Sequence, residues 1–292
     1  MLSGLRRRLE LAPARYRWPV KWAILLVVTF GALFPHPGLF LRHIRHFRQL
    51  DSLPDPADPA LAPMAARFES FLDEKGLASA DASVLLREVE TFVRREIPYG
   101  WDWEVWGVAD YIPTVSEVIA RGREDCDGRA VLAAALLRHK GVPAELVADT
   151  RHMWVRAPEG ETMDPLGPPI LQAQDGQVRV RWSGLIDLGP PAYGVAVLPL
   201  GRELIILLTL WVLLLPWRVD RRSALLALGL MLQGLVLIRT AGTDPLAPWR
   251  GGILLGLLSL SLPVAGLWLV RLRHRPVAAP QPASLAALEE SS

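Results

Sequence analysis

The sequence has little charge and almost no cysteine. Only 21% of its 292 residues are charged, and it contains a single cysteine. Soluble chains usually carry about a quarter charged residues, and the mean hydropathy here is positive, at +0.25. We therefore expect part of the chain to lie in a membrane. One cysteine excludes an internal disulfide framework and a metal site built from several cysteines.

The overall net charge of +2 hides a segregation of charge along the chain. Residues 1–35 hold six Lys or Arg against one Glu, a net charge of +5, whereas residues 36–201 hold 17 Lys or Arg against 24 Asp or Glu, a net charge of −7. A basic N-terminus before an acidic segment is typical of a membrane protein with an acidic soluble domain. This balance predicts a lipid bilayer as a partner and no nucleic acid.

Four apolar runs of 12 to 20 residues predict membrane-spanning helices. A full span needs about 20 residues, so only the last run is long enough by itself. The others reach this length only when flanking residues are included in the helix. The expected spans are residues 18–35, 201–217, 223–239 and 251–270. The alternative for the shorter runs is a buried core helix.

The placement of Lys and Arg favours four spans. Basic groups precede the first expected span, separate the second from the third and follow the fourth, so all of them lie in the cytoplasm under the positive-inside rule. The basic residues 1–17 and the tail, residues 271–292, are then cytoplasmic, and the tail is expected to be disordered. A cleaved signal peptide is the alternative for the first run, but no small-x-small cleavage site follows it.

Between the first two spans we expect a juxtamembrane segment with a proline-rich, extended linker over residues 36–63, and an extracytoplasmic domain over residues 64–200. Hydrophobic periodicity predicts helices first and strands afterwards, which indicates an α+β fold. The expected helices lie at residues 68–75, 84–97, 115–121 and 126–140. The expected strands lie at residues 144–148, 152–156, 161–164, 178–182 and 193–198.

Cys126 begins the most apolar of these helices. Amide groups at a helix N-terminus stabilise a thiolate, whereas the neighbouring Asp125 and Asp127 raise the pKa of the thiol, so a base is needed nearby. His152 begins a predicted strand, and Asp164 falls opposite Trp154 or one pair away in the predicted hairpin, within reach of His152. Thiol, imidazole and carboxylate in this order predict a nucleophilic triad. The alternative is a small buried cysteine with a structural histidine.

Short motifs surround these three residues. They are Gly122-Arg-Glu-Asp-Cys126-Asp-Gly-Arg-Ala130, Gly141-Val-Pro143, His152-Met-Trp-Val and Asp164-Pro165, preceded by Tyr99-Gly-Trp-Asp102. Together they resemble the transglutaminase-like superfamily, and the upstream run is similar to its bacterial transglutaminase-like cysteine peptidase branch. The resemblance covers residues 86–166 and implies a papain-like α+β core.

The resemblance also implies roles for the residues. Cys126 would attack a carboxamide to give a thioester, His152 would act as base and then acid, and Asp164 would orient His152. The oxyanion would be held by the Cys126 amide and one further donor, for which Trp101, Trp106 and Tyr111 are candidates. No cofactor is required, and Asp125 and Asp127 are candidate calcium ligands. Two features depart from the family, a very short loop before His152 and Glu124 where glycine is common.

Three functions follow from these observations. The first is a membrane-anchored thiol enzyme in a bacterial inner membrane, acting on protein or peptide amides outside the cytoplasm by hydrolysis rather than cross-linking. The second is a catalytically inactive binding module on a membrane scaffold, since a fold does not guarantee its chemistry. The third, a channel formed by the C-terminal spans, is weak because Gln233 is the only polar amide or charge inside the apolar runs between Leu204 and Val270, with Arg239 and Arg250 at their ends.

Overall fold

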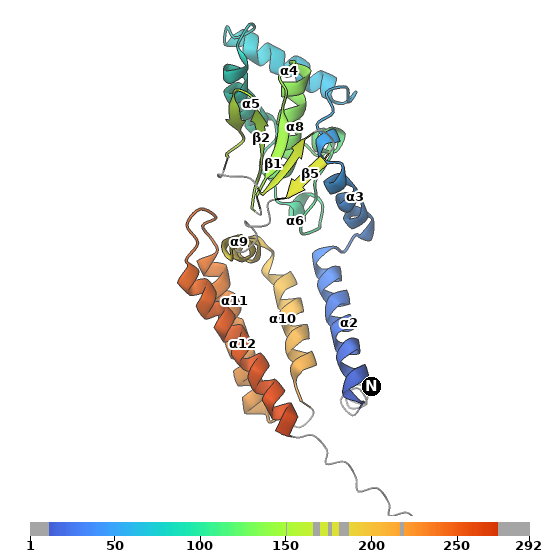
Figure 1. Cartoon of the computed structure of the whole chain (residues 1–292), viewed down its shortest axis with the longest axis vertical. Coiled ribbons are helices and arrows are strands. Elements are labelled where there is room, and N and C mark those ends of the chain that lie inside the picture. Colours follow the sequence, from blue (N-terminus) through green and yellow to red (C-terminus); the bar gives the residue numbers. More distant parts are fainter. Residues whose placement is uncertain are drawn as a thin grey trace, which may run out of the picture.

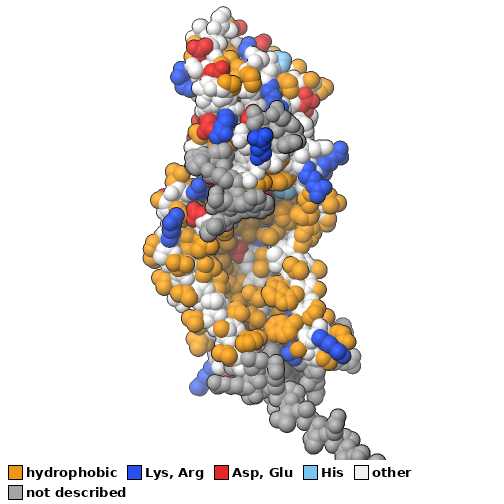
Figure 2. Space-filling model, in the orientation of Figure 1, with side chains coloured by type: hydrophobic (Ala, Val, Ile, Leu, Met, Phe, Trp, Pro, Cys, Tyr) orange, Lys and Arg blue, Asp and Glu red, His pale blue; other side chains and the backbone are white. Residues whose placement is uncertain are grey.

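A computed structural model describes residues 12–149, 151–165, 170–174, 177–180, 187–216 and 219–273. A mixed helix and sheet domain sits at one end of a set of long helices, with the short helix α9 lying between them (Figure 1). The two parts differ in composition. Figure 2 shows hydrophobic side chains over much of the visible face of the long helices, whereas acidic and basic side chains gather on the domain.

The helices of the domain include all four predicted ones, although the first starts at Leu61 instead of residue 68, and one short helix that was not predicted. They are α4 (Leu61–Glu74), α5 (Ala82–Glu96), the short α6 (Asp102–Val105), α7 (Val115–Arg121) and α8 (Cys126–His139). Every residue from Ala130 to Leu137 is buried, because α4, α5, α7 and the sheet surround α8 on all sides. Thr114 and Glu117 form the expected capping box at the start of α7, and Gly122 ends that helix in the left-handed conformation, with φ +68°.

One five-stranded antiparallel sheet packs against α8 in the order β3-β2-β1-β4-β5. Its strands are β1 (Glu145–Ala148), β2 (Met153–Ala157), β3 (Gly160–Thr162), β4 (Leu171–Gln174) and β5 (Gln177–Val180). The predicted β2–β3 hairpin is confirmed, with Val155 opposite Thr162. Strand β4 was not predicted, and the end of the strand expected at residues 178–182 lies outside the described residues.

The strand expected at residues 193–198 is wrong. This segment belongs to helix α9 (Gly189–Val197), whose first turn carries two prolines. Proline sets a helical φ and lacks the N–H that the first turn leaves unpaired, so it favours a helix start at this position.

The extended linker is also not observed. Helix α3 (Pro37–Arg48) and the 3-10 turn η1 (Leu50–Ser52) occupy the first part of residues 36–63, and Leu50 and Leu53 are buried in the core of the domain. The guanidinium of Arg138 donates hydrogen bonds to the carbonyl of Asp51 at 2.8 Å and to that of Pro54 at 3.2 Å. Because Arg138 satisfies these carbonyls, the proline-rich chain folds back on the domain, and the packed core starts at Leu50 instead of Met64.

The long helices are α2 (Ala14–Leu33), α10 (Leu200–Leu214), α11 (Arg221–Ala241) and α12 (Arg250–Arg273). Among the described residues, α11 and α12 are long and apolar enough to cross a membrane by themselves. Two more spans are reached only if bent pairs count as one each, α2 with α3 at 81° and α9 with α10 at 110°. The described part of the chain therefore has two to four helices suited to a membrane.

Polar contacts attach the domain to these helices. The backbone amide of Ala109 donates to the carbonyl of Leu33 at 2.8 Å, and the guanidinium of Arg202 donates to the carbonyl of Gly107 at 2.7 Å. Arg239, near the end of α11, pairs with Glu203 of α10 and donates to the carbonyl of Val195 in α9 at 2.9 Å. The contacts of Arg239 hold α9 across the ends of α10 and α11, directly below the domain.

Candidate active site

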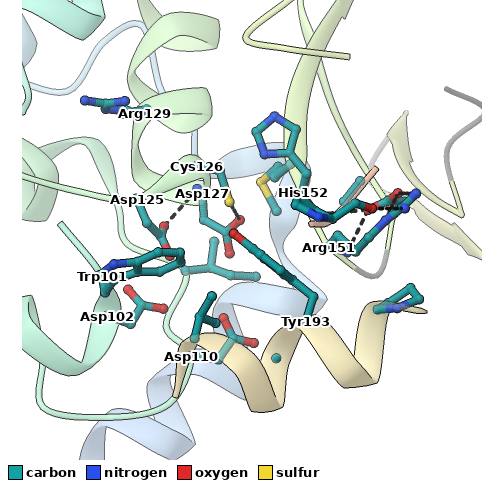
Figure 3. Close-up of a pocket in the computed structure, with 18 of the residues that line it drawn as sticks. Trp101, Asp102, Asp110, Asp125, Cys126, Asp127, Arg129, Arg151, His152 and Tyr193 are labelled. Carbon is teal, nitrogen blue, oxygen red and sulfur yellow. Dashed lines mark hydrogen bonds and ion pairs between the residues drawn. The ribbon is translucent and has the colours of Figure 1, made fainter. Parts of the chain in front are cut away.

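A cavity of about 830 Å³ lies between the domain and the helices at its base. Cys126, His152 and Asp164 all line it, together with Tyr193 of α9 and Leu246 of the loop between α11 and α12. Figure 3 shows labelled side chains from both parts of the molecule around this space. The three residues proposed as a triad thus reach one site, as the sequence predicts.

Cys126 is the first residue of α8 and is held by its neighbours on both sides. Asp125 caps the helix by accepting the Asp127 amide at 3.0 Å, and the backbone of Glu124 pairs with those of Pro98 and Gly100. The thiol donates to the Asp127 carboxylate at 3.3 Å. Burial and the charges of Asp127 and Asp125 raise the pKa of Cys126 well above its ordinary value, although the Met153 backbone amide lowers it. The thiol is therefore protonated in this arrangement.

The ring of His152 is oriented by a main-chain carbonyl. Its Nε2 lies 2.7 Å from the carbonyl oxygen of Met163. A carbonyl only accepts hydrogen bonds, so Nε2 carries the proton, and Nδ1 of the neutral ring is left as an acceptor. The backbone amide of His152 donates to Asp149 at 2.9 Å, which fixes the start of β2. This leaves Nδ1 as the nitrogen that can take a proton from a thiol.

Asp164 lies at the same cavity but is not paired with His152 within the described chain. Met163 and Asp164 adopt left-handed backbone angles, with φ +68° and +58°, so the chain leaves β3 before Asp164 can face the imidazole. The Asp164 carboxylate is 61% exposed and pairs with Arg94 of α5. Glu90 of α5 holds this turn by accepting the Met163 amide at 2.9 Å. The role of Asp164 as an orienting residue stays a prediction.

Two of the three predicted oxyanion donors are occupied. The Trp106 indole donates to Glu124 at 2.8 Å and the Tyr111 hydroxyl donates to Glu117 at 2.8 Å, whereas Trp101 lines the cavity. Figure 3 shows a further hydroxyl, that of Tyr193, which points from α9 into the cavity toward Cys126. Sequence reasoning missed Tyr193, because its apolar surroundings carried no signal for a site.

Buried carboxylates gather behind the cysteine. Asp102, Glu124 and Asp125 each offer an oxygen, and these atoms lie within 4.8 Å of one another. The side chains of Asp102 and Glu124 are buried, and one oxygen of each has no hydrogen-bond partner among the described residues. Burial, followed by the neighbouring charges, raises the pKa of Glu124 to about 8 and that of Asp125 to about 7.

Unpaired buried oxygens on several carboxylates fit a hard divalent cation such as calcium. Of the two predicted ligands, Asp125 belongs to this cluster, whereas Asp127 groups with Asp125 and the thiol. The sequence reading missed Asp102 and Glu124. It treated Glu124 only as a departure from glycine, and nothing in the sequence linked Asp102 to a position 22 residues later.

Comparison of the chain with protein-family models, with curated proteins and with solved structures gave no match. The resemblance of residues 86–166 to the transglutaminase-like superfamily therefore stays a prediction from motifs. What the geometry defines is a class of site, with one thiol and the imidazoles of His152 and His43 at an acidic cavity that lies against apolar helices.

Proposed function

We propose that this chain is a membrane-anchored thiol hydrolase of transglutaminase-like type, with a papain-like core, that acts on protein or peptide amides. The observation that carries the proposal is the orientation of His152, whose Nδ1 has no hydrogen-bond partner among the described residues and which lines the cavity that holds the one cysteine of the chain. The Lys and Arg placement supports a domain outside the cytoplasm of a bacterial inner membrane, with both termini inside.

The proposed reaction uses the residues of the cavity in sequence. Nδ1 of His152 takes the thiol proton of Cys126, and the sulfur attacks the amide carbonyl to form a tetrahedral oxyanion. The protonated imidazole then gives its proton to the departing amine, which leaves a thioester on Cys126. Water activated by His152 hydrolyses the thioester and restores the thiol. The Cys126 amide and the Tyr193 hydroxyl are the proposed donors to the oxyanion.

Alkylation of the intact protein tests this proposal, because the chain has only one cysteine. We expect iodoacetamide to modify Cys126 in nanodiscs with calcium at a rate that is nearly constant between about pH 7 and 9, as for an activated thiolate. A rate that rises about tenfold per pH unit through this range would contradict it. Mass spectrometry of the whole chain measures the rate.

A second function, a binding module without catalysis, is favoured by one specific observation. The thiol of Cys126 donates to Asp127, and its surroundings raise its pKa. An unactivated thiol of this kind gives the steep pH dependence just described. The alkylation profile therefore decides between the two functions.

We further propose that Asp102, Glu124 and Asp125 hold a divalent cation, with Asp127 beside it. When bound, the cation supplies the positive charge that offsets these carboxylates and favours the thiolate form of Cys126. No other cofactor is proposed.

Terbium luminescence checks this site independently of activity. The Trp106 indole nitrogen lies 2.8 Å from an oxygen of Glu124, so excitation of tryptophan should sensitise a Tb³⁺ ion bound there. We expect Asp102→Asn to weaken Tb³⁺ binding about 10-fold or more. Asp73→Asn, on the exposed face of α4, is the matched control and should leave binding unchanged. Equal binding by both variants would place the cation elsewhere.

A further inference from the structure

The catalytic cavity is built from two different parts of the chain. Cys126, His152 and Asp110 come from the domain, whereas Tyr193 and Leu246 come from elements attached to the long helices. Figure 3 shows Tyr193 on α9 facing the same space as Cys126 and Asp110. The domain by itself would therefore lack one wall of this cavity.

The second wall lies where the apolar helices end. α9 turns into α10 through a bend of 110°, and the Leu246 loop joins the end of α11 at Ala241 to the start of α12 at Arg250. Leu246 and Trp249 in this loop are 68% and 58% exposed. Exposed apolar and tryptophan side chains at the ends of spans are typical of the interface between bilayer and water.

The loop that carries His152 is tied directly to this end of the helices. Arg151 donates to the carbonyl of Pro245 at 2.6 Å, and its guanidinium also pairs with Asp149, at 2.7 Å. Asp149 in turn accepts the backbone amide of His152 at 2.9 Å. Hydrogen bonds from a charged group are stronger than neutral ones, so the contacts of Arg151 hold the catalytic loop and the loop at the ends of α11 and α12 together.

We propose that the substrate is a polypeptide anchored in the same membrane, cleaved at an amide within a few residues of the bilayer surface. This inference rests on the proposed thiol hydrolase function. A soluble protein would have to push its amide between the domain and the lipid headgroups to reach Cys126. A chain anchored in the same bilayer is already at this level, and tethering of this kind raises the effective concentration by orders of magnitude.

Lipid-tethered electrophiles test the position of the cavity. The full chain in nanodiscs of phosphatidylethanolamine and phosphatidylglycerol would receive iodoacetamide linked to the phosphatidylethanolamine headgroup by a short spacer. In a Cys126→Ala background, Asp110→Cys reports the exposed lip of the cavity, and Ser70→Cys reports the exposed surface of α4 at the far end of the domain (Figure 1). Relative to free iodoacetamide, we expect the tethered reagent to label Asp110→Cys at least about 10-fold faster than Ser70→Cys. Equal labelling would overturn the inference.

An anchored peptide tests the substrate class in the wild-type chain. A short iodoacetamide peptide with a palmitoyl group should alkylate Cys126 at least about 10-fold faster than the same peptide without it. Suppose that the tethered reagent labels Asp110→Cys from the lipid but that the palmitoyl group does not raise the alkylation rate of Cys126. This result would overturn the substrate class and leave the thiol function intact. A Cys126 that resists both peptides and free iodoacetamide would instead overturn the proposed function itself.

Discussion

Replacement of His152 with alanine should slow alkylation of Cys126 at pH 7 about 100-fold in the calcium-loaded protein. Burial, followed by the charges of Asp127 and Asp125, raises the pKa of the thiol, so without a base little of it is ionised at this pH. With the base in place, most of it can ionise. The measurement is the second-order rate with iodoacetamide, followed by intact mass.

His139→Ala is the matched control, because His139 is an exposed residue at the far end of the same helix that Cys126 begins. It should leave the rate unchanged within about twofold. A wild-type rate in His152→Ala would show that the imidazole does not activate the thiol, and the binding module would then be the better description.

Asp164→Ala separates the two ways of orienting His152. If the Met163 carbonyl holds the ring, as the 2.7 Å contact indicates, this variant should lose less than about threefold in the alkylation rate. If Asp164 leaves Arg94 and turns inward during catalysis, the loss should exceed about 10-fold, and the triad predicted from the sequence would be confirmed.

Gly128→Ala should destabilise the domain by about 1–3 kcal/mol, although alanine is usually the better helix former. A Cβ atom at Gly128 would lie 2.6 Å from Cγ of Glu124, whose buried side chain passes over the first turn of α8. Overpacking of this kind costs about 1–3 kcal/mol. The free energy of unfolding, followed by tryptophan fluorescence in denaturant, measures the effect.

The matched test places the same substitution in a Glu124→Gly background. With the Glu124 side chain removed, Gly128→Ala should become stabilising by roughly 0.5–1 kcal/mol, the usual preference for alanine over glycine in a helix. The sign of the effect should therefore reverse between the two backgrounds. Destabilisation of equal size in both would show that Glu124 is not the obstacle.

The local features of this protein could be predicted from its sequence. The capping box of Thr114 and Glu117, the helix ends at Gly122 and Gly141 and the turn between β2 and β3 depend on residues a few positions apart. The start of α8 at Cys126 is equally local. Because the short hairpin also places His152 directly before β2, the position of Cys126 and His152 at one cavity followed from the order of elements.

The remaining features depend on contacts between distant parts of the chain, which no local pattern encodes. Arg94 pairs with Asp164, which is 70 positions later in the sequence, and so holds it away from His152. Arg138 binds Asp51 of the proline-rich segment, which is 87 positions earlier, and so holds this segment against the domain. Asp102 joins Glu124 only because the backbone just before α6 pairs with Glu124, just before α8, through the bridge between Tyr99 and Glu124. Tyr193 enters it because Arg239 holds α9 across the helix ends. In each case a hydrogen bond or an ion pair between remote segments selects one arrangement among several that the local sequence allows, so only the tertiary structure decided it.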